Sequence, residues 1–142
     1  MSFRQISDMV QDKNPVTLPE TATVQAACRK MCERRVGAVL VTDKRHRLVG
    51  IFTGRDAVSR MLAEGRDPAK THLVDVMTAR PSTLPTTMSA VDALRLMQDG
   101  GFRHIPVVEA DGRIVSVISR GDFRGLEQAR LDEETGLIER IW

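Results

Sequence analysis

The chain of 142 residues reads PVTLPETATVQAACRKMCERRVGAVLVTDKRHRLVGIFTGRD at residues 15–56 and PSTLPTTMSAVDALRLMQDGGFRHIPVVEADGRIVSVISRGD at residues 81–122. The two stretches have the same length and align without a gap at an offset of 66 positions, so that Asp56 falls on Asp122. Apolar positions of one stretch meet apolar positions of the other. A repeat of this kind indicates one structural unit present twice, and it decides the fold before any single motif is considered.

Both units show the same order of local patterns. Prolines keep the opening Pro-x-Thr-Leu-Pro stretch extended, and the apolar stripe that follows recurs at helical spacing. Two apolar runs separated by a polar turn then predict a β-hairpin, and a second helix ends the unit. In the first unit we expect these elements at residues 15–19, 24–31, 36–41, 48–52 and 56–64. In the second unit they begin at residue 81, with strands at 102–108 and 114–118 and a helix from Asp122 onward.

The predicted fold is therefore α+β, with two strand–helix–strand–strand–helix repeats packed as a pseudo-two-fold pair. A three-stranded sheet with one apolar face is unstable alone, and a second copy packed on that face buries it. We place the first repeat at residues 1–66, the second at 67–126 and a partly helical tail at 127–142, with a break near Gly136. The single tryptophan, Trp142, is expected to dock on the module or on a second subunit.

A hydroxyl at the end of each second strand is followed three residues later by an aspartate. The pairs are Thr53 with Asp56 and Ser119 with Asp122. This spacing is typical of a capping box, in which the hydroxyl caps a helix and the acid reaches back to the first amide. A helix start also favours an anion such as phosphate, and a nearby carboxylate can accept hydrogen bonds from a ribose diol. Capping and nucleotide binding both stay open, and the two can hold together.

These features together resemble the CBS (cystathionine-β-synthase) domain family. The tandem repeat, the hairpin and the Gly/Ser-h-h-Thr/Ser-x-x-Asp pattern carry the likeness, which spans residues 6–126. The stretches DVMT at 75–78 and RHIPVV at 103–108 are equally typical. The resemblance implies two clefts between the repeats that bind AMP, ADP, ATP or a related adenosyl ligand. It also implies a regulatory sensor module that requires no cofactor and catalyses no reaction.

The resemblance assigns roles to individual residues. It implies that the two aspartates hold ribose hydroxyls, that the hydroxyl residues before them contact ribose or phosphate, and that the backbone of each first hairpin strand contacts adenine. Threonines in each opening stretch would lie near the base, and arginines and one histidine are candidates for phosphate. The expected ligand-binding residues are Thr17, Val36, Gly37, Ala38, Thr53, Arg55, Asp56, Thr83, Phe102, Arg103, His104, Ser119, Arg120 and Asp122.

The two repeats differ where the clefts are expected. The first repeat has Gly37-Ala38 at the place where the second has Arg103-His104. Small residues leave room for a flat base, whereas arginine and histidine offer donors to phosphate, and histidine titrates near neutrality. We therefore expect unequal clefts, one of which binds a charged nucleotide tightly.

Composition argues against several other classes. The 21 basic residues are interspersed with 19 acidic ones, for a net charge of +2, so that no nucleic-acid partner is expected. No apolar run approaches the ~18 residues of a membrane span, and we expect a cytoplasmic protein. Cys28 and Cys32 have no other metal-ligand residues nearby, and we expect buried thiols. The sequence contains neither a P-loop nor a nucleophile elbow, and we therefore do not expect an enzyme.

One alternative function is left by the sequence alone. Duplicated small domains often associate, so the chain could be a structural or protein-interaction module with empty clefts. In either case we expect a homodimer that covers the helical surface around Val58, Met61 and Leu62. The sequence names neither a regulated protein partner nor the number of phosphates on the ligand.

Overall fold

The computed structural model describes residues 4–11 and 13–141, with side chains through residue 135. Its first half contains α1 (Ile6–Met9), β1 (Thr17–Pro19), α2 (Val24–Arg34), β2 (Ala38–Thr42), β3 (Leu48–Thr53), α3 (Gly54–Asp56) and the π-helical segment η1 (Ala57–Leu62). Its second half contains α4 (Leu73–Val76), β4 (Thr78–Ala79), α5 (Ala90–Gly100), β5 (His104–Val108), β6 (Ile114–Ser119), the 3₁₀ turn η2 (Arg120–Asp122) and α6 (Gly125–Ile141).

The two central helices begin in the same way and end in the same backbone conformation, but on different residue types. The hydroxyls of Thr23 and Ser89 each accept a hydrogen bond from the backbone amide three residues later, at 3.2 and 3.1 Å, and so cap α2 and α5. Both helices end on a residue with a left-handed backbone, which is Arg35 (φ +53°) in one unit and Gly101 (φ +70°) in the other. Glycine adopts this conformation freely, whereas arginine adopts it at a cost of roughly 1 kcal/mol.

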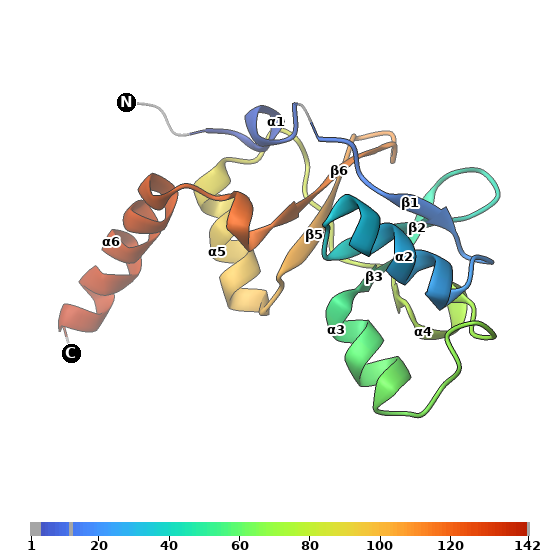
Figure 1. Ribbon diagram of the computed structural model, residues 1–142. Helices are drawn as coiled ribbons and strands as arrows, with labels where there is room; N and C mark the ends of the chain where they lie inside the picture. Colours follow the sequence, from blue (N-terminus) through green and yellow to red (C-terminus); the bar gives the residue numbers. More distant parts are fainter. Residues whose placement is uncertain (1–3, 12, 142) are drawn as a thin grey trace.

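The strands form one four-stranded and one two-stranded sheet (Figure 1). In the first, β1 runs parallel to β2, and β3 lies antiparallel between β2 and β4. In the second, β5 and β6 form a hairpin, and the stretch equivalent to β1 is reduced to a single parallel bridge between Leu84 and Val107. The predicted α+β pair of repeats is confirmed, with a weaker opening strand in the second repeat.

Each repeat contributes its entry helix to the core of the other repeat. Ile6 and Met9 of α1 are buried in the cluster built on α5, β5 and β6. Leu73 and Val76 of α4 are buried in the cluster built on α2, β2 and β3, which includes Phe52. Figure 1 shows α1 beside α5 and α4 beside the first sheet. The two hydrophobic cores therefore cross the predicted boundary at residues 66 and 67.

A third apolar cluster lies between the sheets. It joins Ala38, Leu40 and Ile51 of the first repeat to Ile114 and Val117 of the second. This cluster holds the two sheets together at the middle of the pair.

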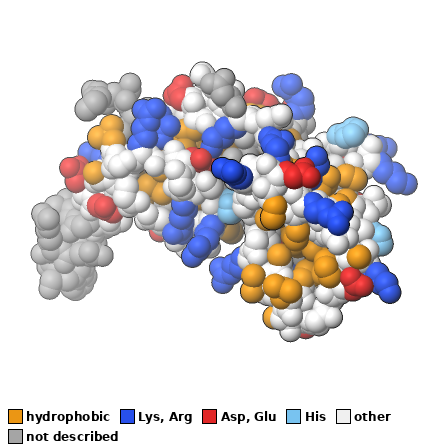
Figure 2. Space-filling model, in the orientation of Figure 1, with side chains coloured by type: hydrophobic (Ala, Val, Ile, Leu, Met, Phe, Trp, Pro, Cys, Tyr) orange, Lys and Arg blue, Asp and Glu red, His pale blue; other side chains and the backbone are white. Residues whose placement is uncertain are grey.

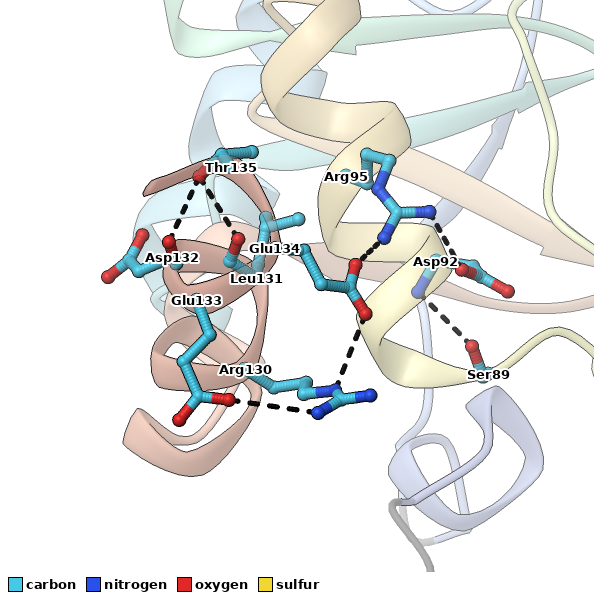
Figure 3. A network of polar contacts seen from close by, with 9 residues as sticks. All are labelled: Ser89, Asp92, Arg95, Arg130, Leu131, Asp132, Glu133, Glu134 and Thr135. Carbon is cyan, nitrogen blue, oxygen red and sulfur yellow. Dashed lines mark hydrogen bonds and ion pairs between the residues drawn. The ribbon is translucent and has the colours of Figure 1, made fainter. Parts of the chain in front are cut away.

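The C-terminal helix α6 extends the second repeat. It starts at Gly125 and continues to Ile141 without a break near Gly136, contrary to the expectation from sequence. Leu131 is buried against Val91 and Leu94 of α5. Figure 3 shows the polar contacts along the same seam, in which the Glu134 carboxylate accepts from Arg95 of α5 and pairs with Arg130 at 3.4 Å. Packing against α5 therefore stabilises α6.

Three expectations from the sequence need correction or fall outside the description. Cys32 is exposed and Cys28 is only half-buried, because Cys32 follows the buried Met31 and lies on the solvent side of α2. Met61 is buried rather than exposed, because it points from η1 into the first core. The prediction for Trp142 lies outside the described residues.

In the part of the chain that the structure describes, no helix is long and apolar enough to cross a membrane.

Candidate functional site

A cleft of about 920 Å³ opens at one side of the contact between the repeats. We call it the Asp56 cleft. It is lined by residues 53–56 at the end of β3, residues 80–82 after β4 and residues 101–104 at the start of β5. The first repeat thus provides the hydroxyl-and-aspartate motif, and the second provides the opening stretch and the start of its hairpin.

A second cleft, of about 340 Å³, opens at the other side and is called the Asp122 cleft. It is lined by residues 13–16 before β1, residues 35–38 before and at the start of β2, and the end of β6 with Asp122. These segments are equivalent to those of the Asp56 cleft, with the two repeats exchanged. The predicted pair of clefts is therefore present in the geometry.

In the Asp56 cleft the aspartate closes a capping box. One carboxylate oxygen, Oδ2, accepts hydrogen bonds from the Thr53 amide at 3.0 Å and the Thr53 hydroxyl at 3.1 Å. The Thr53 hydroxyl in turn accepts from the Asp56 amide at 3.3 Å. The other oxygen, Oδ1, has only a 3.6 Å ion pair with Arg60 among the described residues. The carboxylate is buried and fixed, and Oδ1 keeps acceptor capacity for a ligand.

In the Asp122 cleft the same box carries an additional cation. Asp122 Oδ2 accepts from the Ser119 amide at 2.8 Å, and the Lys13 ammonium pairs with the same oxygen. Burial raises the pKa of the Asp122 carboxyl, but the hydrogen bonds and charge of Lys13, together with Ser119, outweigh burial and leave the pKa below its usual value. The Asp122 carboxylate is thus ionised and already neutralised by Lys13. At the position equivalent to Lys13, the second repeat has Ala79.

His104 separates the two clefts and lines both of them. A side chain at Gly37 would place its Cβ 2.9 Å from His104 Nε2, so that a larger residue there would require the imidazole to move. Burial lowers the pKa of His104, the Asp122 charge raises it and the Arg103 charge lowers it, for a net decrease. The imidazole is therefore neutral at pH 7 and forms a shared wall rather than a fixed positive charge.

The structure brings together eleven of the expected ligand-binding residues. Asp56, Thr53, Arg55, Phe102 and Arg103 line the larger cleft, Val36, Ala38, Ser119 and Asp122 line the smaller one, and Gly37 and His104 line both.

Three expected residues are not among the described linings. Thr17 and Thr83 are exposed, each one position beyond the lining of a cleft. The Arg120 guanidinium donates to the carbonyl oxygens of Phe102 at 2.9 Å and Met97 at 3.0 Å, so that it caps the end of α5.

Sequence reasoning missed three cations that line the clefts. Lys13 and Arg35 belong to the Asp122 cleft, and Arg80 belongs to the Asp56 cleft. Arg80 comes directly before the repeated Pro81, and its left-handed backbone (φ +50°) turns the chain there. The signal was available in the alignment of the repeats, because a residue beside a repeated proline at a strand entry lies beside the cleft.

The arrangement offers several groups that can bind a ligand. Asp56 and Asp122 occupy equivalent positions, and apart from arginine the other ionisable side chains of the described linings are Lys13 and His104. Within the described residues, no group of three or more histidine, cysteine or acidic side chains could hold a metal ion. Fixed hydrogen-bond acceptors and cations beside an open cleft are the chemistry of a ligand site.

Comparisons with known proteins agree with this geometry. The family model described as CBS domain matches residues 6–63 and 73–127. A CBS domain-containing protein of Arabidopsis thaliana is 43% identical over 103 residues, which are 72% of this chain and 18% of that protein. An uncharacterised 17.7 kDa protein of Acidianus ambivalens is 31% identical over 131 residues, 92% of this chain and 76% of that protein. The chain thus spans under a fifth of its plant relative.

Solved structures show the same fold. A CBS domain protein from Pyrobaculum aerophilum, complexed with AMP, superposes with a TM-score of 0.82 at 27% identity and covers 91% of this chain and 98% of that one. The match of the family model to both repeats, and the sequence identity to two relatives, decide the assignment. The chain belongs to the CBS domain family.

Proposed function

We propose that the chain is a non-catalytic regulatory module that binds an adenine nucleotide, with the Asp56 cleft as its stronger site. The observation that carries the proposal is the Asp56 carboxylate, which is fixed by Thr53 on one oxygen and keeps acceptor capacity on the other, at the edge of a 920 Å³ cleft. A ribose diol is a donor that fits such a carboxylate. The AMP bound to the related protein of Pyrobaculum aerophilum supports the same ligand class.

We expect the smaller Asp122 cleft to bind a nucleotide more weakly than the Asp56 cleft. Its aspartate is already paired with Lys13, so that a ribose must compete with an internal cation. Its volume of about 340 Å³ lies near the lower limit of small-molecule sites. Both differences favour the Asp56 cleft as the first site to fill.

A thermal-shift titration with AMP, ADP and ATP tests the proposal. A ligand that binds only the folded protein raises the melting temperature with its concentration. We expect a concentration-dependent rise with adenine nucleotides and a smaller one with inosine monophosphate, since inosine differs from adenosine only at the base. An unchanged melting temperature at millimolar nucleotide would contradict nucleotide binding. Conversion of ATP to products, monitored by chromatography, would contradict a non-catalytic role.

A second function, self-association, has an observation of its own. Val58 and Leu62 lie one helical turn apart and are 59% and 77% exposed. Figure 2 shows hydrophobic side chains gathered at the lower right, where Figure 1 draws α3 and η1. We propose that a second copy of the chain covers this surface in a closed dimer. Light scattering is expected to give a dimer for the native chain and a monomer for Leu62→Glu. A native monomer at micromolar concentration would contradict the proposal.

A further inference from the structure

Three arginines converge on the Asp56 cleft from three separate segments. Arg55 lies at the start of α3, Arg80 follows β4, and Arg103 precedes β5. All three are exposed, and none is hydrogen-bonded or ion-paired through its side chain to another described residue. Some arginines elsewhere are engaged: Arg120 donates to carbonyl oxygens and Arg47 is paired with Asp43. The cleft therefore holds positive charge that the protein does not neutralise.

The only acid in this lining cannot balance that charge. Asp56 is the single carboxylate among the described lining residues, with its Oδ2 bound to Thr53 and its Oδ1 in a 3.6 Å ion pair with Arg60. Two arginines are therefore left in excess over the acid even if Asp56 is counted in full. Like charges around one open volume repel each other, and the resulting positive potential attracts a polyanion.

The other cleft has none of these arginines. The equivalent positions, at the offset of 66, are Asn14, Gly37 and Gly121. Its two cations are Lys13, which is paired with Asp122, and Arg35. Because the two repeats provide equivalent backbone segments, the difference in charge between the clefts comes from side chains at equivalent positions. A single phosphate can be served by one free arginine, whereas three free arginines around a larger volume suit a chain of phosphates.

We propose that the Asp56 cleft selects its ligand by phosphate number and binds nucleoside triphosphate more tightly than diphosphate or monophosphate. The inference rests on the proposed nucleotide-binding function and adds to it the ligand class of one cleft. Ribose held by Asp56 leaves the phosphates to the three arginines. The selection arises from charge, so it weakens as salt screens the site.

Isothermal titration of the full chain with adenosine, AMP and ATP in magnesium-free buffer measures this selection. We expect ATP to bind at least about tenfold more tightly than AMP at low salt, and the ratio to fall as salt rises. The test variant is Arg80→Asn combined with Arg103→Gly, since each change introduces the residue that the other cleft has at that position. Asparagine also tolerates the left-handed backbone at position 80.

The variant is expected to bind ATP and AMP with nearly equal affinity and to keep its affinity for adenosine. The matched control is Arg45→Ala, which removes one arginine from an exposed hairpin turn outside both described linings and should keep the tenfold ratio. Equal ATP and AMP affinities in the native chain would overturn phosphate selection and leave nucleotide binding intact. Loss of the ratio of ATP to AMP affinity in Arg45→Ala would also overturn phosphate selection by this cleft, because the ratio would then depend on the net charge of the protein. Binding of none of the three ligands would overturn both proposals.

Discussion

The Asp56 and Asp122 clefts are built from equivalent backbone and differ in charge. Each combines a Thr/Ser-x-x-Asp box from one repeat with the hairpin start of the other. In the Asp122 cleft the carboxylate is paired with Lys13, whereas the Asp56 cleft has unpaired arginines. The two repeats therefore share the capping and apolar residues that form the fold. They differ in the charged residues at the cleft edges.

The same contrast extends to the junctions behind the clefts. Behind the Asp122 cleft, Arg4 donates to the Glu127 carboxylate at 2.6 and 3.0 Å and to the Asp122 carbonyl oxygen at 3.1 Å. Behind the Asp56 cleft, Arg60 donates to the carbonyl oxygens of Val76 and Met77 at 3.1 and 2.9 Å. Glu127 is 1% exposed, whereas the Arg60 side chain is about half exposed. One junction is a buried ion pair and the other is a surface contact.

The largest expected effect is on the buried junction. Arg4→Ala leaves the Glu127 carboxylate buried without its partner, and we expect the free energy of unfolding to fall by about 3 kcal/mol. The matched change at the other junction, Arg60→Ala, is expected to cost about 1 kcal/mol because it removes hydrogen bonds near the surface. Urea denaturation of the three proteins measures both values. Equal losses would show that the two junctions do not differ as described.

The next effect separates the two aspartates by ligand affinity. Asp56→Ala is expected to weaken ATP binding by about 1–3 kcal/mol through the loss of a charge-assisted hydrogen bond. Asp122→Ala is expected to change it less, because Lys13 already occupies that carboxylate. Both variants lose a helix cap, so that both should melt at lower temperature. Calorimetry with melting curves alongside distinguishes the roles. Reduced stability with unchanged affinity in both would mean that the acids only cap.

Lys13 offers a smaller and more specific test. Lys13→Ala gives the Asp122 cleft the residue that the other repeat has, Ala79, and releases the Asp122 carboxylate. A partly exposed ion pair contributes at most about 1 kcal/mol, so we expect nucleotide affinity at this cleft to rise by up to about fivefold. The titration is done in the Asp56→Ala background, in which the stronger site is weakened. Weaker binding after the change would show that Lys13 contacts the ligand instead of blocking it.

The smallest expected effect concerns pH. The pKa of His104 is lowered in the folded chain, chiefly by burial. As pH falls through about 6.5, the unfolded chain therefore binds a proton before the folded chain does, and stability decreases toward acid. We expect His104→Asn to show a shallower loss of stability than the native chain between pH 7.5 and 5.5. Parallel curves from denaturation at several pH values would contradict a buried neutral imidazole at the shared wall.

Local patterns predicted much of the fold and of the site. The capping box at Thr53 and Asp56 could be read from the sequence because its residues are three positions apart and its hydrogen bonds are local. The repeat placed the two boxes in equivalent positions. The two clefts were predicted from the family resemblance, because composition and spacing alone do not indicate them.

Contacts between distant segments could not be predicted in the same way. Lys13 and Asp122 are far apart in the chain, and only the crossing of the entry segment into the other repeat brings them together. Arg120 was expected at phosphate, but it donates to the carbonyl oxygens of Met97 in α5 and of Phe102 just after α5, which no spacing rule indicates. The expected break in α6 is also absent: the helix continues through Gly136, where the local signal was weak.

A crystal structure of the chain grown with one equivalent of ATP shows directly whether the Asp56 cleft is the stronger nucleotide site. We expect the nucleotide in the Asp56 cleft, with its ribose on Asp56 and its phosphates among Arg55, Arg80 and Arg103. The Asp122 cleft is expected to keep its ion pair with Lys13. ATP bound in the Asp122 cleft, with the Asp56 cleft empty, would contradict the claim.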